Sequence, residues 1–343
     1  MSASTLHGDV QPYSMRKRLL QMLGAVFFAL GLYAAILGPL EFVTFYFYSP
    51  GGRWHYEGFG FGSLWFGVLA IQIIGFYLVA AVLIPLGYGH LRLRPWVGKL
   101  SLTVLWGWLV LGLPCALTVF TIFVLSKEPP EGTYPVIAGA CLLMYPVLPV
   151  LMIRIYRSPT TRAAFQQTGG EGGWIERTPQ PILVLGGLMV FFILALHVLF
   201  FLNGVFPVFG GFVSGMKGIF LTDLAIFLLA VLTYGVFSRR MWAWWGAIVY
   251  FALLALSYTL SFLMGGGRNF IDQMRLSGWE LKILEDPPHG IWFVLLFVPP
   301  MIATLVLIAF SRRHFHPFEL RALSLSDVYM LLLIVALWAL FLT

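Results

Sequence analysis

The sequence predicts an all-α integral membrane protein with nine transmembrane helices. Of its 343 residues, 60% are hydrophobic and only 10% are charged, whereas a soluble domain carries about 25% charged residues. So few polar side chains cannot coat a globule of this size in water. The apolar residues also fall in long runs that short basic segments separate. These observations exclude a water-soluble enzyme, a nucleic-acid-binding domain and a disordered chain.

Eight apolar runs reach the length of about 20 residues that a membrane-spanning helix needs. We expect these eight spans at approximately residues 19–40, 63–88, 100–125, 135–156, 182–203, 218–237, 242–264 and 291–310. A ninth run, 328–343, is shorter and reaches a spanning length if residues 323–326 contribute. The outer loop 265–290 has apolar residues at helical spacing, so we expect it to lie on the membrane surface.

Small residues on the first span predict close helix packing there. Gly24, Gly31, Ala35 and Gly38 share one face of this span. Small side chains let the backbones of two membrane helices approach each other closely. We therefore expect this face to contact a neighbouring helix.

The positions of lysine and arginine predict the orientation. With the N-terminus in the cytoplasm, fifteen of the 21 basic residues fall on the cytoplasmic side and six on the outer side. This is the bias expected from the positive-inside rule. We therefore predict a multi-pass protein of the plasma membrane with a cytoplasmic tail at residues 1–18. The C-terminus lies outside if the ninth helix spans.

The two halves of the chain resemble each other. Residues 86–96 (LGYGHLRLRPW) align without gaps on residues 232–242 (LTYGVFSRRMW), and each segment lies between two apolar runs. Prolines also recur inside the fourth span of each half, at Pro146, Pro149, Pro299 and Pro300. The alternative is a chance match between leucine-rich helices.

From this similarity we expect two four-helix repeats, at residues 19–158 and 182–313. A cytoplasmic linker at 159–181 joins them, and a cytoplasmic loop with the last helix follows at 314–343. Because each repeat has an even number of spans, both must insert the same way up. We therefore expect parallel repeats related by a pseudo-two-fold axis along the membrane normal.

Ionisable residues inside spans are the candidate functional groups, since they are costly in a bilayer. Glu41, His197 and Asp223 are candidate catalytic residues, because carboxylates and imidazoles serve as general acids and bases, proton relays or metal ligands. They belong to a polar group on the outer side of the membrane: Glu41, His55, Glu57, His197, Asn203, Asp223 and His289. The alternative is structural, with helix capping or ion pairing by the carboxylates and a hydrogen bond from His197 to a neighbouring helix.

The sequence predicts no cofactor and no metal. A haem with two axial histidines needs both at similar depth, and only His197 lies well inside a span, with His90, His314 and His316 expected in cytoplasmic loops. Cys115 and Cys141 lack the spacing of a metal or redox site. The aromatic content of 17% is compatible with a bound lipid or quinone, although exposure to lipid also explains it. The basic residues form no patch for nucleic acid.

Three functions fit these features. The scarcity of buried charge and the absence of a catalytic motif favour an accessory or scaffolding subunit of a larger membrane complex. Its partners would be the lipid bilayer and other membrane subunits, or further copies of the chain. The first alternative is a transporter of a small or amphipathic solute through a cavity between the repeats. The second is an outer-face enzyme that acts on a lipid-linked substrate, and on balance we expect no enzyme.

Overall fold

The computed structural model describes residues 10–55, 59–61, 63–125, 133–166, 173–274 and 289–316. Eight helices in these ranges are long and apolar enough to cross a membrane. The predicted class, a multi-pass helical membrane protein, and the eight longer predicted spans are therefore confirmed. The ninth predicted helix at 328–343 and the candidate residue Glu57 lie outside the described residues.

The long helices follow the predicted spans and extend beyond most of them. In the first half they are α1 (Val10–Tyr48), α2 (Leu64–Leu91), α3 (Pro95–Leu125), α4 (Thr133–Leu142), the π-helical turn η1 (Leu143–Val147) and α5 (Leu148–Arg157). In the second half they are α8 (Gln180–Phe201), α9 (Gly215–Phe237), α10 (Met241–Asp272) and α12 (Gly290–Ser311). Shorter elements connect them: α6 (Pro159–Gln166), α7 (Trp174–Arg177), β1 (Phe206–Val208), β2 (Gly211–Val213) and the 3-10 turn η2 (Arg312–His314).

Proline changes the fourth span of the first half. The ring of Pro146 cannot donate a hydrogen bond within a regular α-helix and clashes with the preceding turn. The chain widens to a π turn around it, in which the amide of Leu148 donates to the carbonyl of Leu143. In the second half α12 continues as an α-helix past Pro299 and Pro300.

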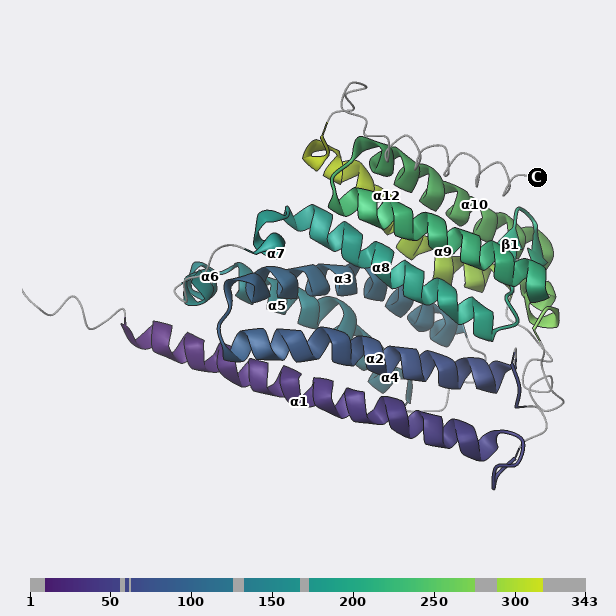
Figure 1. Cartoon of the computed structure of the whole chain (residues 1–343), viewed down its shortest axis with the longest axis horizontal. Helices are drawn as coiled ribbons and strands as arrows, with labels where there is room; N and C mark the ends of the chain where they lie inside the picture. The colour runs from purple at the N-terminus through teal and green to yellow at the C-terminus, as the bar shows by residue number, and fades with distance from the viewer. Residues whose placement is uncertain are drawn as a thin grey trace, which may run out of the picture.

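The helices run roughly alongside one another (Figure 1). Helix α1 lies at one edge next to α2; α3 and α8 follow, and α9, α10 and α12 lie on the other side (Figure 1). The short helices α6 and α7 lie at one end of the bundle, while β1 lies at the opposite end (Figure 1).

The basic segments meet at the end of the bundle that holds α6 and α7. Arg16 of α1 donates to Thr161 of α6 at 3.1 Å, and Lys99 of α3 donates to the carbonyl of Glu176 in α7 at 2.7 Å. The ring of Trp174 in α7 contacts the ring of Phe237 at the end of α9. Arg16 and Lys99 therefore lie at the same end of the bundle, next to α6 and α7.

Helices α1 and α2 form a closely packed pair. A Cβ atom added to Gly24 would lie 2.6 Å from the Cβ of His90, and one added to Gly31 would lie 2.8 Å from a side-chain carbon of Ile84. On the other side, Gly87 of α2 lies against the backbone of Phe28. The predicted small-residue face of the first span is therefore a helix interface.

The densest packing lies in the second half. In the most apolar stretches of α8, α9 and α10, 50%, 56% and 50% of the residues are buried, against 11% in the span formed by α4, η1 and α5. Phe192, Leu229 and Phe251 are among the buried side chains of these three helices. The best-covered spans are thus α8, α9 and α10, whereas α12 is only 22% buried, the same share as in the spans of α1, α2 and α3.

The turns after α2 and after α9 have the same geometry. Leu93 and Arg239 both have positive φ, 50° and 56°. The amide of Arg94 donates to the carbonyl of Gly89 at 2.8 Å, and that of Arg240 donates to Gly235 at 2.9 Å. These are equivalent positions in the two aligned segments, so the sequence similarity coincides with a shared local structure.

Helix α10 continues beyond the predicted end of its span at residue 264. Gly266 interrupts it with φ of 73° and ψ of 165°, a conformation that a side chain would strain. Residues up to Asp272 are helical after this kink. We expected a surface helix within residues 265–290. The structure describes residues 265–274 of this range, and residues 275–288 lie outside the described chain.

Candidate functional site

Three of the candidates lie near the ends of helices or on a helix interface. Glu41 is half-buried on α1, three residues after Gly38, which packs against Tyr77 of α2. His55 is exposed in the turn after α1, and His289 is exposed immediately before α12. Within the described chain none of the three candidates has a side-chain hydrogen bond or an ion pair.

His197 bonds to its own helix. Its Nδ1 lies 2.7 Å from the carbonyl oxygen of Ile193, one turn earlier in α8, and therefore donates a proton to it. The imidazole is half-buried and contacts the ring of Phe200 edge-on at 5.6 Å. The structural alternative for this residue expected a bond to a neighbouring helix, and the observed partner is instead local.

Asn203 joins the ends of three helices. It follows α8, is buried, and has a positive φ of 61°. Its side-chain amide donates to the carbonyl of Gln273 at 2.9 Å, and its own carbonyl accepts from the amide of Gly215 at 2.7 Å. The hydroxyl of Ser214 donates to the side chain of the same glutamine at 2.5 Å. Asn203 thus connects the end of α8 with the start of α9 and the end of α10.

Asp223 lies on the exposed face of α9. No hydrogen bond or ion pair connects it to any residue in the described part of the chain. The helix that carries it packs against α8, α10 and β1, whereas the helix that carries Glu41 packs against α2 and α6. The fold therefore does not bring the two carboxylates together on packed helices.

No contact joins any two of the described candidates into a catalytic group. Across the six described ranges, no three histidine, cysteine or acidic side chains lie close enough to hold a metal ion. The described candidates are distributed over α1, α8 and α9, the residue after α8, and the turns after α1 and before α12. Acid–base catalysis or metal binding by these residues would therefore need further groups from outside the described chain.

Two structural features escaped the sequence analysis, and the first is a buried histidine. His90, expected in a loop, lies in the last turn of α2 and is fully buried. Its Nδ1 donates to the carbonyl of Leu86 at 2.7 Å, and its Nε2 accepts from the hydroxyl of Tyr156 at 2.5 Å. The rings of Phe27 and Phe165 pack edge-on against the imidazole. His90 therefore ties α1, α2, α5 and α6 together.

The second feature is a β-hairpin between α8 and α9. Strands β1 and β2 pair antiparallel through a two-residue turn at Phe209 and Gly210, both with positive φ. Ser257 of α10 donates to the carbonyl of Pro207 at 2.7 Å and accepts from the amide of Phe209, while Ser261 accepts from Gly210. Non-helical backbone is tolerated inside a membrane protein where protein groups satisfy its hydrogen bonds. The available signal was the sequence VFPVFGGFV, in which valines and phenylalanines lie on both sides of two glycines.

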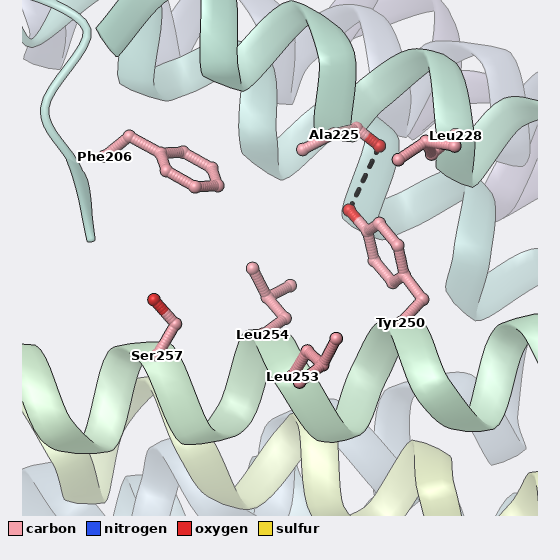
Figure 2. Close-up of a pocket in the computed structure, with 7 residues that line it drawn as sticks. All are labelled: Phe206, Ala225, Leu228, Tyr250, Leu253, Leu254 and Ser257. Atoms are coloured by element: carbon pink, nitrogen blue, oxygen red, sulfur yellow. Dashed lines mark hydrogen bonds between the residues drawn. The ribbon is translucent and has the colours of Figure 1, made fainter. Parts of the chain in front are cut away.

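A small pocket lies between β1, α9 and α10, and Figure 2 shows its lining residues. Its volume is about 20 Å³, and it is lined by Phe206, Ala225, Leu228, Tyr250, Leu253, Leu254 and Ser257. The hydroxyl of Tyr250 points across it to the carbonyl of Ala225, to which it donates at 3.1 Å (Figure 2). Both hydroxyl groups of the lining are already bonded to backbone, so the pocket is apolar in character.

A larger apolar groove of about 330 Å³ lies between α3 and α4. It is lined by Leu113, Ala116, Leu117, Phe120, Ala138, Gly139, Cys141, Leu142 and Pro146. Each of the two pockets therefore lies within one half of the chain. Neither offers polar side chains to a solute.

We expect the double substitution Ser257→Ala and Ser261→Ala to loosen the hairpin. Both hydroxyls accept bonds from partly buried backbone amides of the turn. An amide left fully buried without a partner costs about 1–3 kcal/mol, which is the upper limit here. Hydrogen–deuterium exchange should then show faster exchange of the amides of Phe209 and Gly210. As a control, Thr259→Val removes a hydroxyl that bonds only within α10 and should leave the exchange of the turn unchanged. Unchanged exchange in the double variant would contradict this role.

Fold and candidate residues together define a polytopic α-helical membrane protein whose described polar groups serve mainly to fasten helices. Comparisons with models of protein families, with curated proteins and with solved structures find no match for this chain.

Proposed function

We propose that this protein is an accessory or scaffolding subunit of a larger membrane complex. The observation that carries the proposal is the surface of its least covered span, formed by α4, η1 and α5. Only 11% of the residues in its most apolar stretch are buried. Near its start lies a segment of four small residues, 138–141, three of which line the groove of about 330 Å³.

Small residues on this surface favour a protein partner over lipid alone. Gly139 is exposed, and an added Cβ atom would meet nothing within 4 Å. In membranes, small residues are enriched where helices associate, because they allow the two backbones to approach closely. Leu117 and Leu142 lie at the sides of the groove and expose more than half of their surface. The groove thus has the shape and chemistry to receive an apolar helix.

Extraction under gentle conditions tests this proposal. We expect the protein, drawn out of its native membrane in polymer-bounded lipid discs, to carry stoichiometric partner chains that native mass spectrometry resolves. A Cβ atom added to Gly139 meets nothing within 4 Å. Gly139→Leu therefore adds bulk to the small-residue segment and should reduce partner recovery by about tenfold. Gly75→Leu is the matched control, because Gly75 of α2 also has open space beside it but lies away from the groove.

The result that contradicts the proposal is equally specific. A monodisperse particle that contains one copy of this chain and lipid, with wild type and both variants alike, would exclude a subunit role. Copies of this chain alone in the particle would assign the surface to a homo-oligomer.

No observation in the described chain favours the two alternative functions. A transporter needs a polar-lined cavity between the halves, whereas the two pockets described above are apolar and lie within single halves. An outer-face enzyme needs Glu41, His197 or Asp223 within reach of one another, and no contact links them. Both functions therefore remain weaker proposals than the subunit role.

We also propose that the chain consists of two four-helix repeats. The matching turns after α2 and α9 support this. Between the halves, α2 and α3 pack against α8 and α12. A two-fold axis would equally pair α9 and α10 with α1 and α5, and such contacts are sparse or absent among the described helices. These contacts favour two repeats that lie side by side without a two-fold axis between them.

For orientation we propose that the end with α6 and α7 faces the cytoplasm and that the membrane is the plasma membrane. The basic residues gathered at this end support it through the positive-inside rule. Addition of a membrane-impermeant thiol reagent to intact cells tests the orientation, with single cysteines placed at the exposed positions 55 and 313.

A further inference from the structure

One face of α9 is exposed along the whole span. Its members recur at helical spacing and are Met216, Phe220, Asp223, Phe227, Ala230 and Tyr234. The opposite face packs against α8 and α10 through buried residues such as Leu229 and Leu232. The exposed face is apolar except for the carboxylate of Asp223 and the hydroxyl of Tyr234 close to the other end.

With α9 spanning the bilayer, Asp223 lies within the apolar stretch of this face and not at its end. It is eight residues after Gly215, where α9 begins, and so about 12 Å along the helix axis. Long lysine and arginine side chains can extend from such a depth to the headgroups, but the short aspartate side chain cannot. Phe220 and Phe227 flank it one turn away on either side and expose 61% and 47% of their surface. A carboxylate in this position faces hydrocarbon unless another group covers it.

The described spans offer no matching cation at this depth. Within the described spans, the outer halves hold Lys217 and Arg268 as their basic residues. Lys217 lies six residues nearer the start of α9, about 9 Å closer to the surface, and is itself exposed. Arg268 follows the kink of α10 and bonds Asp272 at 3.1 Å. The ninth predicted helix, 328–343, contains no basic residue.

We propose that the exposed face of α9 docks a transmembrane helix of a partner chain that carries a lysine or arginine in the outer half of the bilayer. The proposal rests on the subunit role proposed above and names the chemistry of one partner. A cation opposite Asp223 would neutralise the carboxylate, and the flanking phenylalanines would exclude lipid headgroups and water from the pair. A second copy of this chain does not fit, because it presents no basic side chain at this depth in the described spans.

A synthetic helix tests this pairing directly. The full-length protein is reconstituted in phosphatidylcholine vesicles with a labelled polyleucine peptide that spans the bilayer and carries one lysine about 12 Å below the outer headgroups. A peptide with leucine at that position is the control, and association is measured by fluorescence energy transfer. We expect the lysine peptide to bind wild type at least about tenfold more tightly than it binds Asp223→Asn.

Two further variants make the test specific. Asp272→Asn removes an exposed carboxylate that already has a partner and should leave binding unchanged. Asp223→Lys should lose the lysine peptide and gain a peptide with aspartate at the same depth, because the charges are then exchanged.

Each other outcome overturns the proposal. Equal binding of the lysine and leucine peptides would show that the carboxylate is neutral or covered by lipid. Energy transfer between two labelled copies of the protein that Asp223→Asn abolishes would make a second copy the occupant. A lower thermal stability of the isolated Asp223→Asn protein would place the cation within the same chain. If native extraction yields partners that Asp223→Asn retains in full, this inference fails while the subunit role stands.

Discussion

Replacing Gly87 with alanine should destabilise the protein, although alanine normally favours a helix over glycine by about 0.5–1 kcal/mol. The added Cβ atom would lie 2.4 Å from the backbone nitrogen of Phe28 and 2.7 Å from its Cα. Backbone atoms cannot rotate away as a side chain can, so α1 would have to separate from α2. Such overpacking costs typically about 1–3 kcal/mol.

The matched control is Gly75→Ala on the same helix. No atom lies within 4 Å of a Cβ atom added there, so this substitution should be neutral or stabilising. Both free energies of unfolding can be measured for the protein in mild detergent by denaturant titration of the tryptophan fluorescence. If the two substitutions shift stability in the same direction and by the same amount, close contact between α1 and α2 does not limit stability.

The second large effect is expected at the hydrogen bond between Tyr156 and His90. Tyr156→Phe removes the hydroxyl that donates to Nε2 and leaves that nitrogen buried without a partner. Because His90 is fully buried, the unpaired acceptor should cost about 1–3 kcal/mol. The same denaturant titration measures this loss.

A double-mutant cycle separates the hydrogen bond from the loss of volume. His90→Val places at this position the residue that occupies position 236 in the other aligned segment. Valine has no acceptor, so Tyr156→Phe in the His90→Val background should cost less than it does in wild type. Equal costs in both backgrounds would show that the two side chains contribute independently.

Much of the fold follows from composition and pattern. Hydrocarbon accepts only segments whose backbone hydrogen bonds are satisfied internally, so apolar runs of about 20 residues predict helices with little ambiguity. All eight longer runs are helices of spanning length. The small face of the first span predicted a helix interface, and Gly24 and Gly31 do lie in one.

The candidate site could not be predicted in the same way. A residue such as Asp223 is recognisable from sequence as an ionisable group inside a span, but its partner is a property of which helix faces meet. His90 shows the reverse case, because the basic residues after it suggested a loop and the tertiary contacts of α1, α5 and α6 bury it. The hairpin at 206–213 depends likewise on Ser257 and Ser261, some 50 residues away.

The sequence by itself determined the membrane class, the spans, and the gathering of basic residues between them, because transfer of each segment into a bilayer depends on its own composition. Only the tertiary structure decided that the best-buried helices are α8, α9 and α10, that the candidate residues lie apart, and that the side chain of Asp223 is exposed on the surface of the helix bundle. Those outcomes depend on which helix faces pack together. In lipid that choice rests on shape and hydrogen bonding between distant segments, which local composition does not encode.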